Sequence, residues 1–197
     1  MQPLTQKLKS ELRPYRDVIL FVVAMLAANF FWKLTIHGDE EGFGAVTWLG
    51  VDITCWFDAM VRNTTLWAYR LAHLFLPDIY PIGEDVIRHA SGYGIKVIWG
   101  CTPLKQSFIF TCIMLATGPY FVRIHREHRL TALHKLWFLP IGWILIYGFN
   151  ILRIAGIVLL THAHPEWFEV LHFYVFKYLF YGFIFLIWVY WVERISR

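Results

Sequence analysis

Charged residues are scarce in this chain. Asp, Glu, Lys and Arg make up 16% of its 197 residues, whereas a typical soluble domain contains about 25%. Cysteine is also rare, and the three cysteines, Cys55, Cys101 and Cys112, show none of the spacing expected of a metal site. The sequence contains no internal repeat and no low-complexity tract. These deficits argue against an ordinary soluble domain and give no sign of a metal module or a repeat array.

Apolar residues take the place of the missing charge, and they are gathered in long runs. Hydrophobic residues make up 58% of the chain and aromatic residues 19%. Residues 18–36 contain a single charge, Lys33, and as a helix they can cross a hydrocarbon core of about 30 Å. The run is too long for a signal peptide, and residues 29–32 do not resemble a small-residue cleavage site. We therefore expect a retained transmembrane helix.

Similar runs predict three further transmembrane helices, over residues 103–122, 136–162 and 172–193. Each can satisfy its backbone hydrogen bonds internally as a helix, which is how a single segment crosses lipid. Residues 44–77 are apolar on average but contain Asp52, Asp58, Arg62 and Arg70. This segment forms either two short helices in an extra hairpin or helices that lie at the outer interface.

Residues 78–100 have a different character, because short β-prone stretches flank the turn sequence Ser91-Gly92-Tyr93-Gly94. Such a pattern is typical of a β-hairpin. The sequence thus predicts an all-α polytopic membrane protein, a single domain over residues 1–197. It would be a bundle of four to six transmembrane helices, with a small β-hairpin on the outer face just before Cys101.

The distribution of charge predicts the orientation of this bundle. Basic residues gather in an N-terminal arm, residues 1–17, in the loop 123–135 and at the C-terminus, whereas residues 37–41 and 164–169 are acidic. By the positive-inside rule, both termini and the basic loop are cytoplasmic and the acidic loops face outward. The net charge of +4 is therefore an orientation signal, and it gives no reason to expect nucleic-acid binding.

Arg153 is the polar residue that lipid should most strongly exclude. It lies between apolar stretches in the middle of the 136–162 run, where an ionisable side chain costs about 2.5–3.5 kcal/mol to insert. An arginine stays protonated even there, so it needs an anionic or carbonyl partner or a water-filled cavity. Asn150 lies three residues earlier on the same helical face and is placed to orient the guanidinium. The alternative without a functional role is that the Arg153 side chain snorkels to the nearer membrane interface.

Cys101 follows the predicted hairpin and precedes a helix that opens with Thr102-Pro103. Proline suits a first helical turn, so the cysteine lies near a helix N-terminus, where exposed N–H groups favour a thiolate and can hold an oxyanion. Cys55 and Cys112 lack such a setting, and we interpret both as ordinary small apolar residues. A disulfide between Cys55 and Cys101 is the remaining alternative if both face an oxidising compartment.

His172 begins the last predicted helix, directly after the acidic outer loop, and an imidazole can exchange a proton near neutral pH. His162 and His164 are rival candidates on the same side. Cys101, Arg153 and His172 start from three different helices, yet all are predicted to lie near the outer boundary. A thiol nucleophile, a base and an oxyanion stabiliser are sufficient for acyl transfer.

At these residues the sequence resembles the exosortase/archaeosortase family of membrane-embedded cysteine transpeptidases. Gly100-Cys101-Thr102-Pro103 is similar to the family's cysteine motif, and Asn150-Ile151-Leu152-Arg153 is similar to its asparagine–x–x–arginine motif. Leu171-His172 resembles the third block. The small size and residues 51–54 resemble the short members of the Bacteroidetes lineage. Pro103 stands where the family usually has glycine, which removes a backbone N–H that an oxyanion could use.

The resemblance implies a sorting reaction at the outer face of a bacterial cytoplasmic membrane. The substrates would be exported proteins with a C-terminal tail composed of a short motif, a transmembrane helix and a basic cluster. Cys101 would attack a peptide bond near the motif, Arg153 would stabilise the intermediate, and His172 would shuttle the proton. The acyl group would pass to a lipid, a saccharide or water, and no metal or organic cofactor is implied.

Two other functions are open at this point. A non-catalytic assembly factor or export-system subunit would use the same polar residues to hold its helices together. A small transporter or channel would use Arg153 to bind an anion, but it would need a polar stripe along several helices. The mostly apolar runs 106–122 and 173–192 argue against that stripe.

Overall fold

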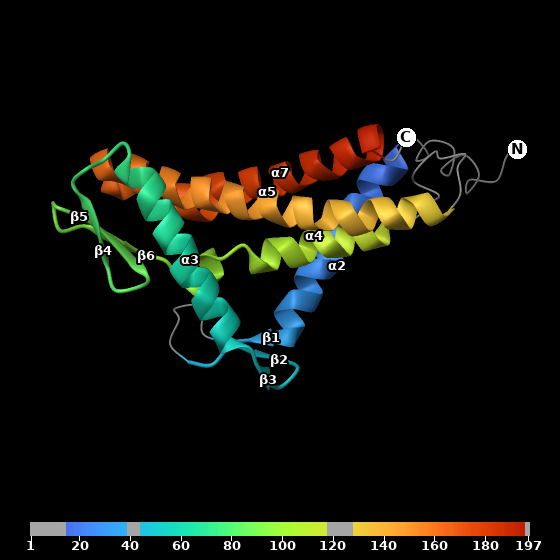
Figure 1. Ribbon diagram of the computed structural model, residues 1–197, viewed down its shortest axis with the longest axis horizontal. Helices are drawn as coiled ribbons and strands as arrows, with labels where there is room; N and C mark the ends of the chain where they lie inside the picture. The colour runs from blue at the N-terminus through green and yellow to red at the C-terminus, as the bar shows by residue number, and fades with distance from the viewer. Residues whose placement is uncertain (1–14, 39–43, 118–127, 196–197) are drawn as a thin grey trace, which may run out of the picture.

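The computed structural model describes residues 15–38, 44–117 and 128–195, which form an elongated and mostly helical molecule (Figure 1). The long helices are α2 (Arg16–Thr35), α3 (Thr54–His73), α4 (Leu104–Ala116), α5 (His128–Ala163) and α7 (Phe176–Tyr190). Between α5 and α7 the chain passes through the 3₁₀ turn η3 (Pro165–Trp167), the short helix α6 (Phe168–Val170) and the π-helical segment η4 (Leu171–Val175). A second π-helical segment, η5 (Trp191–Ile195), follows α7, and the 3₁₀ turn η2 (Trp99–Cys101) precedes α4.

Among the described residues, three helical stretches are long and apolar enough to cross a membrane: Asp17–Thr35, His134–Ala163 and Pro165–Glu193. They correspond to three of the four firmly predicted spans. The fourth, 103–122, is represented by α4, whose 13 residues make a helix of about 20 Å. Residues 118–122 of that span lie outside the described residues. The membrane character is thus supported, while four to six crossings remain a prediction.

The predicted helix limits at the start of α5 and at the start of the last span need correction. Residues 123–135 were expected to form a loop, but α5 begins at His128 and continues without a break to Ala163. Leucine, alanine and lysine dominate the stretch from 130 to 136, and these residues propagate a helix whether or not lipid surrounds it. The final span starts at Pro165 rather than at 172, with proline in the first turn where its missing N–H costs nothing.

Residues 44–77 contain one helix, α3, instead of the two short ones in an extra hairpin. Helix α3 is steeply inclined to α5 (Figure 1) and packs against it. The residues before α3 form a small sheet that the sequence pattern did not predict: β1 (Ile36–His37), β2 (Thr47–Trp48) and β3 (Val51–Asp52). Its strands have two residues each, too few to show alternation, and a Leu49–Gly50 turn with positive φ at both residues joins β2 to β3.

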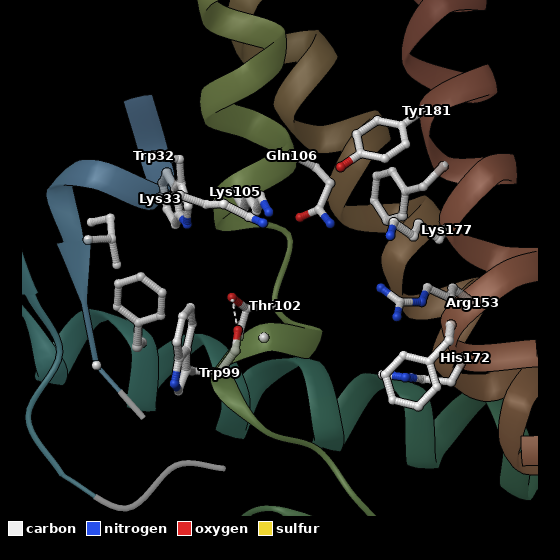
Figure 2. Close-up of a pocket in the computed structure, with 16 residues that line it drawn as sticks. Trp32, Lys33, Trp99, Thr102, Lys105, Gln106, Arg153, His172, Lys177 and Tyr181 are labelled. Atoms are coloured by element: carbon white, nitrogen blue, oxygen red, sulfur yellow. Dashed lines mark hydrogen bonds between the residues drawn. The ribbon is translucent and has the colours of Figure 1, made fainter. Parts of the chain in front are cut away.

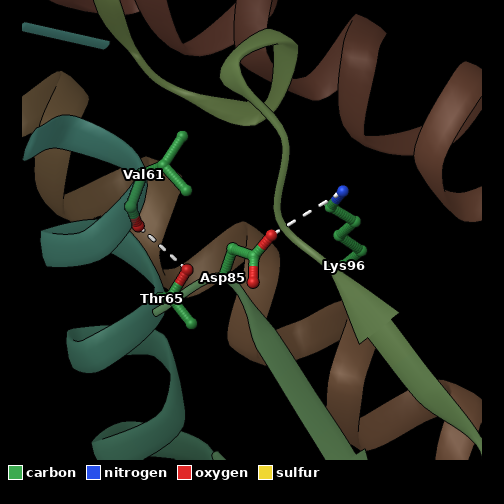
Figure 3. A network of polar contacts seen from close by, with 4 residues as sticks. All are labelled: Val61, Thr65, Asp85 and Lys96. Atoms are coloured by element: carbon green, nitrogen blue, oxygen red, sulfur yellow. Dashed lines mark hydrogen bonds and ion pairs between the residues drawn. The ribbon is translucent and has the colours of Figure 1, made fainter. Parts of the chain in front are cut away.

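The predicted hairpin is present and belongs to a three-stranded antiparallel sheet. Strands β5 (Val86–His89) and β6 (Gly94–Lys96) pair with Ile87 opposite Ile95, and β4 (Ile79–Ile82) adds a third strand on the other side of β5. Strand β4 was not predicted, because Pro81 lowers its strand character. An ion pair between Asp85 and Lys96, at 3.8 Å, ties the start of β5 to the end of β6 beside α3 (Figure 3).

The buried side chains form two cores, and the chain passes from one to the other at Cys101. The first core fills the helix bundle and includes Phe21, Phe110 and Trp191. The second joins α3, the β4–β5–β6 sheet and the end of α5, and Cys101 belongs to it. In Figure 1 this sheet covers one end of the molecule, and the start of α2 and the end of α7 lie together at the other end. The candidate site therefore lies at the junction of bundle and sheet.

Candidate active site

The Cys101 backbone is held by two neighbouring elements. Strand β6 ends at Lys96, and the next residue, Val97, donates its N–H to the backbone oxygen of Asp85 at 2.7 Å. The chain then enters the 3₁₀ turn that contains Cys101. From α5, the side-chain amide of Asn150 donates to the backbone oxygen of Cys101 at 3.0 Å. Asn150 is fully buried. It therefore fixes the cysteine backbone, which differs from the expected role of orienting Arg153.

His172 lies beside the cysteine sulfur. Its Nε2 is 3.5 Å from Sγ of Cys101, a separation at which a thiol proton can pass to the imidazole. His172 lies in the π-helical segment η4, and such segments are frequent at functional sites. The imidazole is held by aromatic rings instead of a carboxylate, since Phe168 stacks on it at 5.4 Å and Phe173 meets it edge-on at 4.8 Å. Its Nδ1 is buried without a hydrogen-bond partner.

Arg153 completes the set from the next turn of α5 after Asn150. Only 6% of its surface is exposed, and its Nε is buried without a hydrogen-bond partner. With His172, Thr102 and Trp99 it lines a cavity of about 460 Å³. Figure 2 shows Arg153 and His172 pointing from the same side toward the centre of this cavity. The snorkelling alternative is not supported, because the guanidinium is buried in the protein.

Burial works against a resting thiolate at Cys101, the form expected from the sequence. Burial raises the pKa of the Cys101 thiol, and a hydrogen bond at the Ile98 backbone and the charge of Arg153 lower it only in part. The helix N-terminus contributes little, because α4 starts at Leu104, three residues after the cysteine. The thiol therefore needs a base at the moment of attack, and His172 is the residue in position to be that base.

Two peptide N–H groups at the cysteine are already hydrogen-bonded. The N–H of Cys101 donates to Ile98 at 2.8 Å and the N–H of Thr102 donates to Trp99 at 3.0 Å. Pro103 has no N–H. The guanidinium of Arg153, which lines the neighbouring cavity, is a charged donor in position to take their place.

The rival residues have other partners. Nδ1 of His162 is 3.0 Å from Nδ1 of His89, and His164 pairs with Glu166, also at 3.0 Å. The Cys55–Cys101 disulfide is absent, since all three cysteines are free. Cys55 is exposed on α3, and Cys112 is half-buried in α4 as the apolar interpretation expected.

Sequence reasoning missed three lysines that line the same cavity: Lys33, Lys105 and Lys177. Lys33 and Lys177 each interrupt an otherwise apolar run, which is the signal that singled out Arg153. The aromatic rings around His172 gave no signal, because aromatic residues are common throughout the chain. Across the described ranges, no three His, Cys, Asp or Glu side chains gather as they would around a metal ion.

No protein-family model, curated protein or solved structure matches this chain. The case for a function therefore rests on the three short motifs and on the geometry of the cavity.

Proposed function

We propose that this chain is a membrane-embedded cysteine transpeptidase or protease of the exosortase type. One observation carries the proposal: Sγ of Cys101 lies 3.5 Å from Nε2 of His172, beside a cavity that the buried Arg153 also lines. A nucleophile beside a cavity that a base and a cation line meets the requirements of acyl transfer. The three residues come from separate parts of the chain, so their meeting does not follow from proximity in the sequence.

In the first step, His172 takes the thiol proton on Nε2 as the sulfur of Cys101 attacks the carbonyl carbon of a peptide bond. The carbonyl oxygen becomes an oxyanion, which the guanidinium of Arg153 stabilises. The C–N bond then breaks, and protonated His172 gives its proton to the departing amine. A thioester on Cys101 and a free amino terminus on the released tail are the products.

In the second step, an acceptor amine, hydroxyl or water attacks the thioester carbonyl while His172 takes its proton. The sulfur leaves with the electron pair of the C–S bond and is reprotonated, which restores the resting thiol. Because the apolar helices are compatible with a membrane, the substrate would be an exported protein anchored by a C-terminal tail. The reaction would occur at the outer face of the cytoplasmic membrane.

Replacement of Cys101 by alanine tests the proposal, with Cys55→Ala as the matched control. In cells that produce the wild-type chain, exported proteins with a C-terminal helix and basic cluster should lose that tail, as read by mass spectrometry of the membrane and released fractions. Cys101→Ala should leave the tails intact although the chain still inserts, whereas Cys55→Ala should process them normally. Intact tails should also accumulate with His172→Gln.

Normal tail processing by Cys101→Ala would eliminate the thiol mechanism. That outcome would favour the non-catalytic assembly or export subunit, in which the same polar residues hold helices together.

A further inference from the structure

Four basic side chains, each from a different helix, line the cavity beside Cys101. Lys33 comes from the last turn of α2, Lys105 from the first turn of α4, Arg153 from α5 and Lys177 from the first turn of α7. None of the described residues that line the cavity is acidic. Figure 2 shows Lys33 and Lys105 approaching from one side and Arg153 from the other. The convergence exceeds what the acyl transfer needs, since that reaction uses one cation.

Several cations around one cavity raise the free energy of the folded chain when no anion is bound. Like charges that share one cavity repel each other, and burial adds to this cost for Arg153. Arg153 cannot escape by losing its proton. Its Nε is buried, with no hydrogen-bond partner, on a side chain that is only 6% exposed. A bound anion would offset both the repulsion and this unsatisfied donor.

The chemistry of the cluster selects the kind of anion. Lysine acts as a point charge and arginine as a planar fork, and together they suit a phosphate group, which carries several acceptor oxygens. A single carboxylate could not engage cations from four helices. The volume of about 460 Å³ accommodates a phosphate with an attached organic group. Trp32, Trp99 and Tyr181 also line the cavity, and such rings favour the level of lipid headgroups.

We propose that this cavity is a phosphate-binding site, with Arg153, Lys33 and Lys177 as ligands and Lys105 also in its lining. The phosphate is either a lipid headgroup or a free phosphate compound. Binding does not depend on the thiol chemistry. The further assignment of the phosphate-bearing molecule as the acceptor of the acyl group does rest on the proposed transpeptidase function.

The test compares two double variants that remove the same charge. Lys33→Gln/Lys177→Gln changes two exposed cavity residues, and Arg70→Gln/Arg88→Gln changes two exposed residues that do not line the cavity. In the first arm, calorimetry measures the binding of inorganic phosphate to the purified chain in phospholipid-free detergent. Chain in phosphatidylcholine nanodiscs with a few spin-labelled phosphatidic acid molecules is examined by electron paramagnetic resonance for an immobilised lipid fraction.

The cavity variant should bind about tenfold more weakly or worse in at least one arm, because charge-assisted bonds are lost. The control variant should match the wild type. Binding of phosphatidic acid identifies a headgroup site, and binding of inorganic phosphate alone identifies a free phosphate site. Equal binding by both variants, or no binding in either arm, would overturn the proposal.

Two further variants separate the explanations. Cys101→Ala should retain phosphate binding, so a loss of tail processing in that variant and a loss of phosphate binding in the lysine variant report on different proposals. The sequence continues from Gly38 into Asp39, Glu40 and Glu41, which lie outside the described residues. If phosphate binds only after these three residues are changed to Asn or Gln, the cations pair with those carboxylates in the wild-type chain. That result would refute the phosphate site.

Discussion

At the scale of single residues, the decisive feature is that Cys101 is buried next to a cation and a base. Its side chain is 7% exposed, and burial raises its pKa although Arg153 opposes that shift. Water solvates a thiolate better than the protein interior does, so the neutral thiol is favoured at rest. Catalysis on this view depends on proton transfer to His172 during attack rather than on a standing thiolate.

The rate of Cys101 alkylation as a function of pH should show whether the resting sulfur is a thiol or a thiolate. In a Cys55→Ser/Cys112→Ser background, the iodoacetamide rate follows the thiolate fraction, with a midpoint for free cysteine of about 8.5. Since the folded-state pKa is raised, the midpoint should lie above that of free cysteine. Arg153→Gln should move it higher, because the guanidinium stabilises the thiolate, and Arg153→Lys should move it less.

A midpoint below that of free cysteine would contradict this interpretation. It would indicate a resting thiolate, of the kind that the sequence alone suggested.

Asn150 shows why residue roles read from spacing can be misassigned. Spacing along one helix puts it next to Arg153, and that proximity suggested that it orients the guanidinium. Its amide instead reaches across to the backbone oxygen of Cys101. A contact between residues 49 positions apart depends on how two elements pack, and no local pattern contains that information.

At the scale of elements, the close approach of α4 to α5 keeps the start of α4 beside the site. Gly142 of α5 permits it, because a Cβ there would lie 2.2 Å from the ring of Phe110. That ring is fully buried in the bundle core and has little room to move. Small residues at helix crossings are a common way for transmembrane helices to approach each other.

Gly142→Ala should therefore destabilise the bundle by about 1–3 kcal/mol, the usual cost of overpacking. Gly148→Ala, in the same helix, is the matched control, since nothing lies within 4 Å of its Cβ position. The control should be neutral or more stable by up to about 1 kcal/mol, the helix propensity gained. Thermal unfolding in detergent measures both, and equal melting temperatures would show that the crossing tolerates a side chain.

The helical elements were largely predictable, and the reason is physical. Long apolar runs determine helices in lipid, so α2, α5 and the final span were placed from residues 18–36, 136–162 and 172–193. Element limits were less accurate, because a helix such as α5 extends beyond its apolar run wherever good helix formers continue. The two-residue strands β1 to β3 were missed since pairing, not local pattern, stabilises them.

At the scale of the whole molecule, the start of α2 and the end of α7 lie at one end and the β4–β5–β6 sheet at the other (Figure 1). The predicted orientation requires these two ends to lie on the same side. That this side is cytoplasmic and that the cysteine faces outward stay predictions. Helix α3 carries Asp58, Arg62 and Arg70 and falls short of the apolar character of a span. We expect it to remain on the outer side.

Cysteine labelling tests this topology. In a Cys101→Ser/Cys112→Ser chain, Cys55 on α3 should react with a membrane-impermeant maleimide added to intact spheroplasts, because it is exposed. A cysteine at position 196, introduced as Ser196→Cys in a chain without the other cysteines, should react only after permeabilisation. Labelling of Cys55 only after permeabilisation would reverse the orientation or make α3 a crossing.

The sequence by itself determined that this chain has apolar helices of membrane length, because hydrophobicity is a sum over neighbouring residues. It also nominated Cys101, Arg153 and His172, because lipid makes isolated polar residues conspicuous. Only the tertiary structure decided that the sulfur and the imidazole lie 3.5 Å apart and that Asn150 holds the cysteine backbone. It alone brought Lys33, Lys105 and Lys177 to the same cavity, since convergence of distant residues is decided by packing between elements.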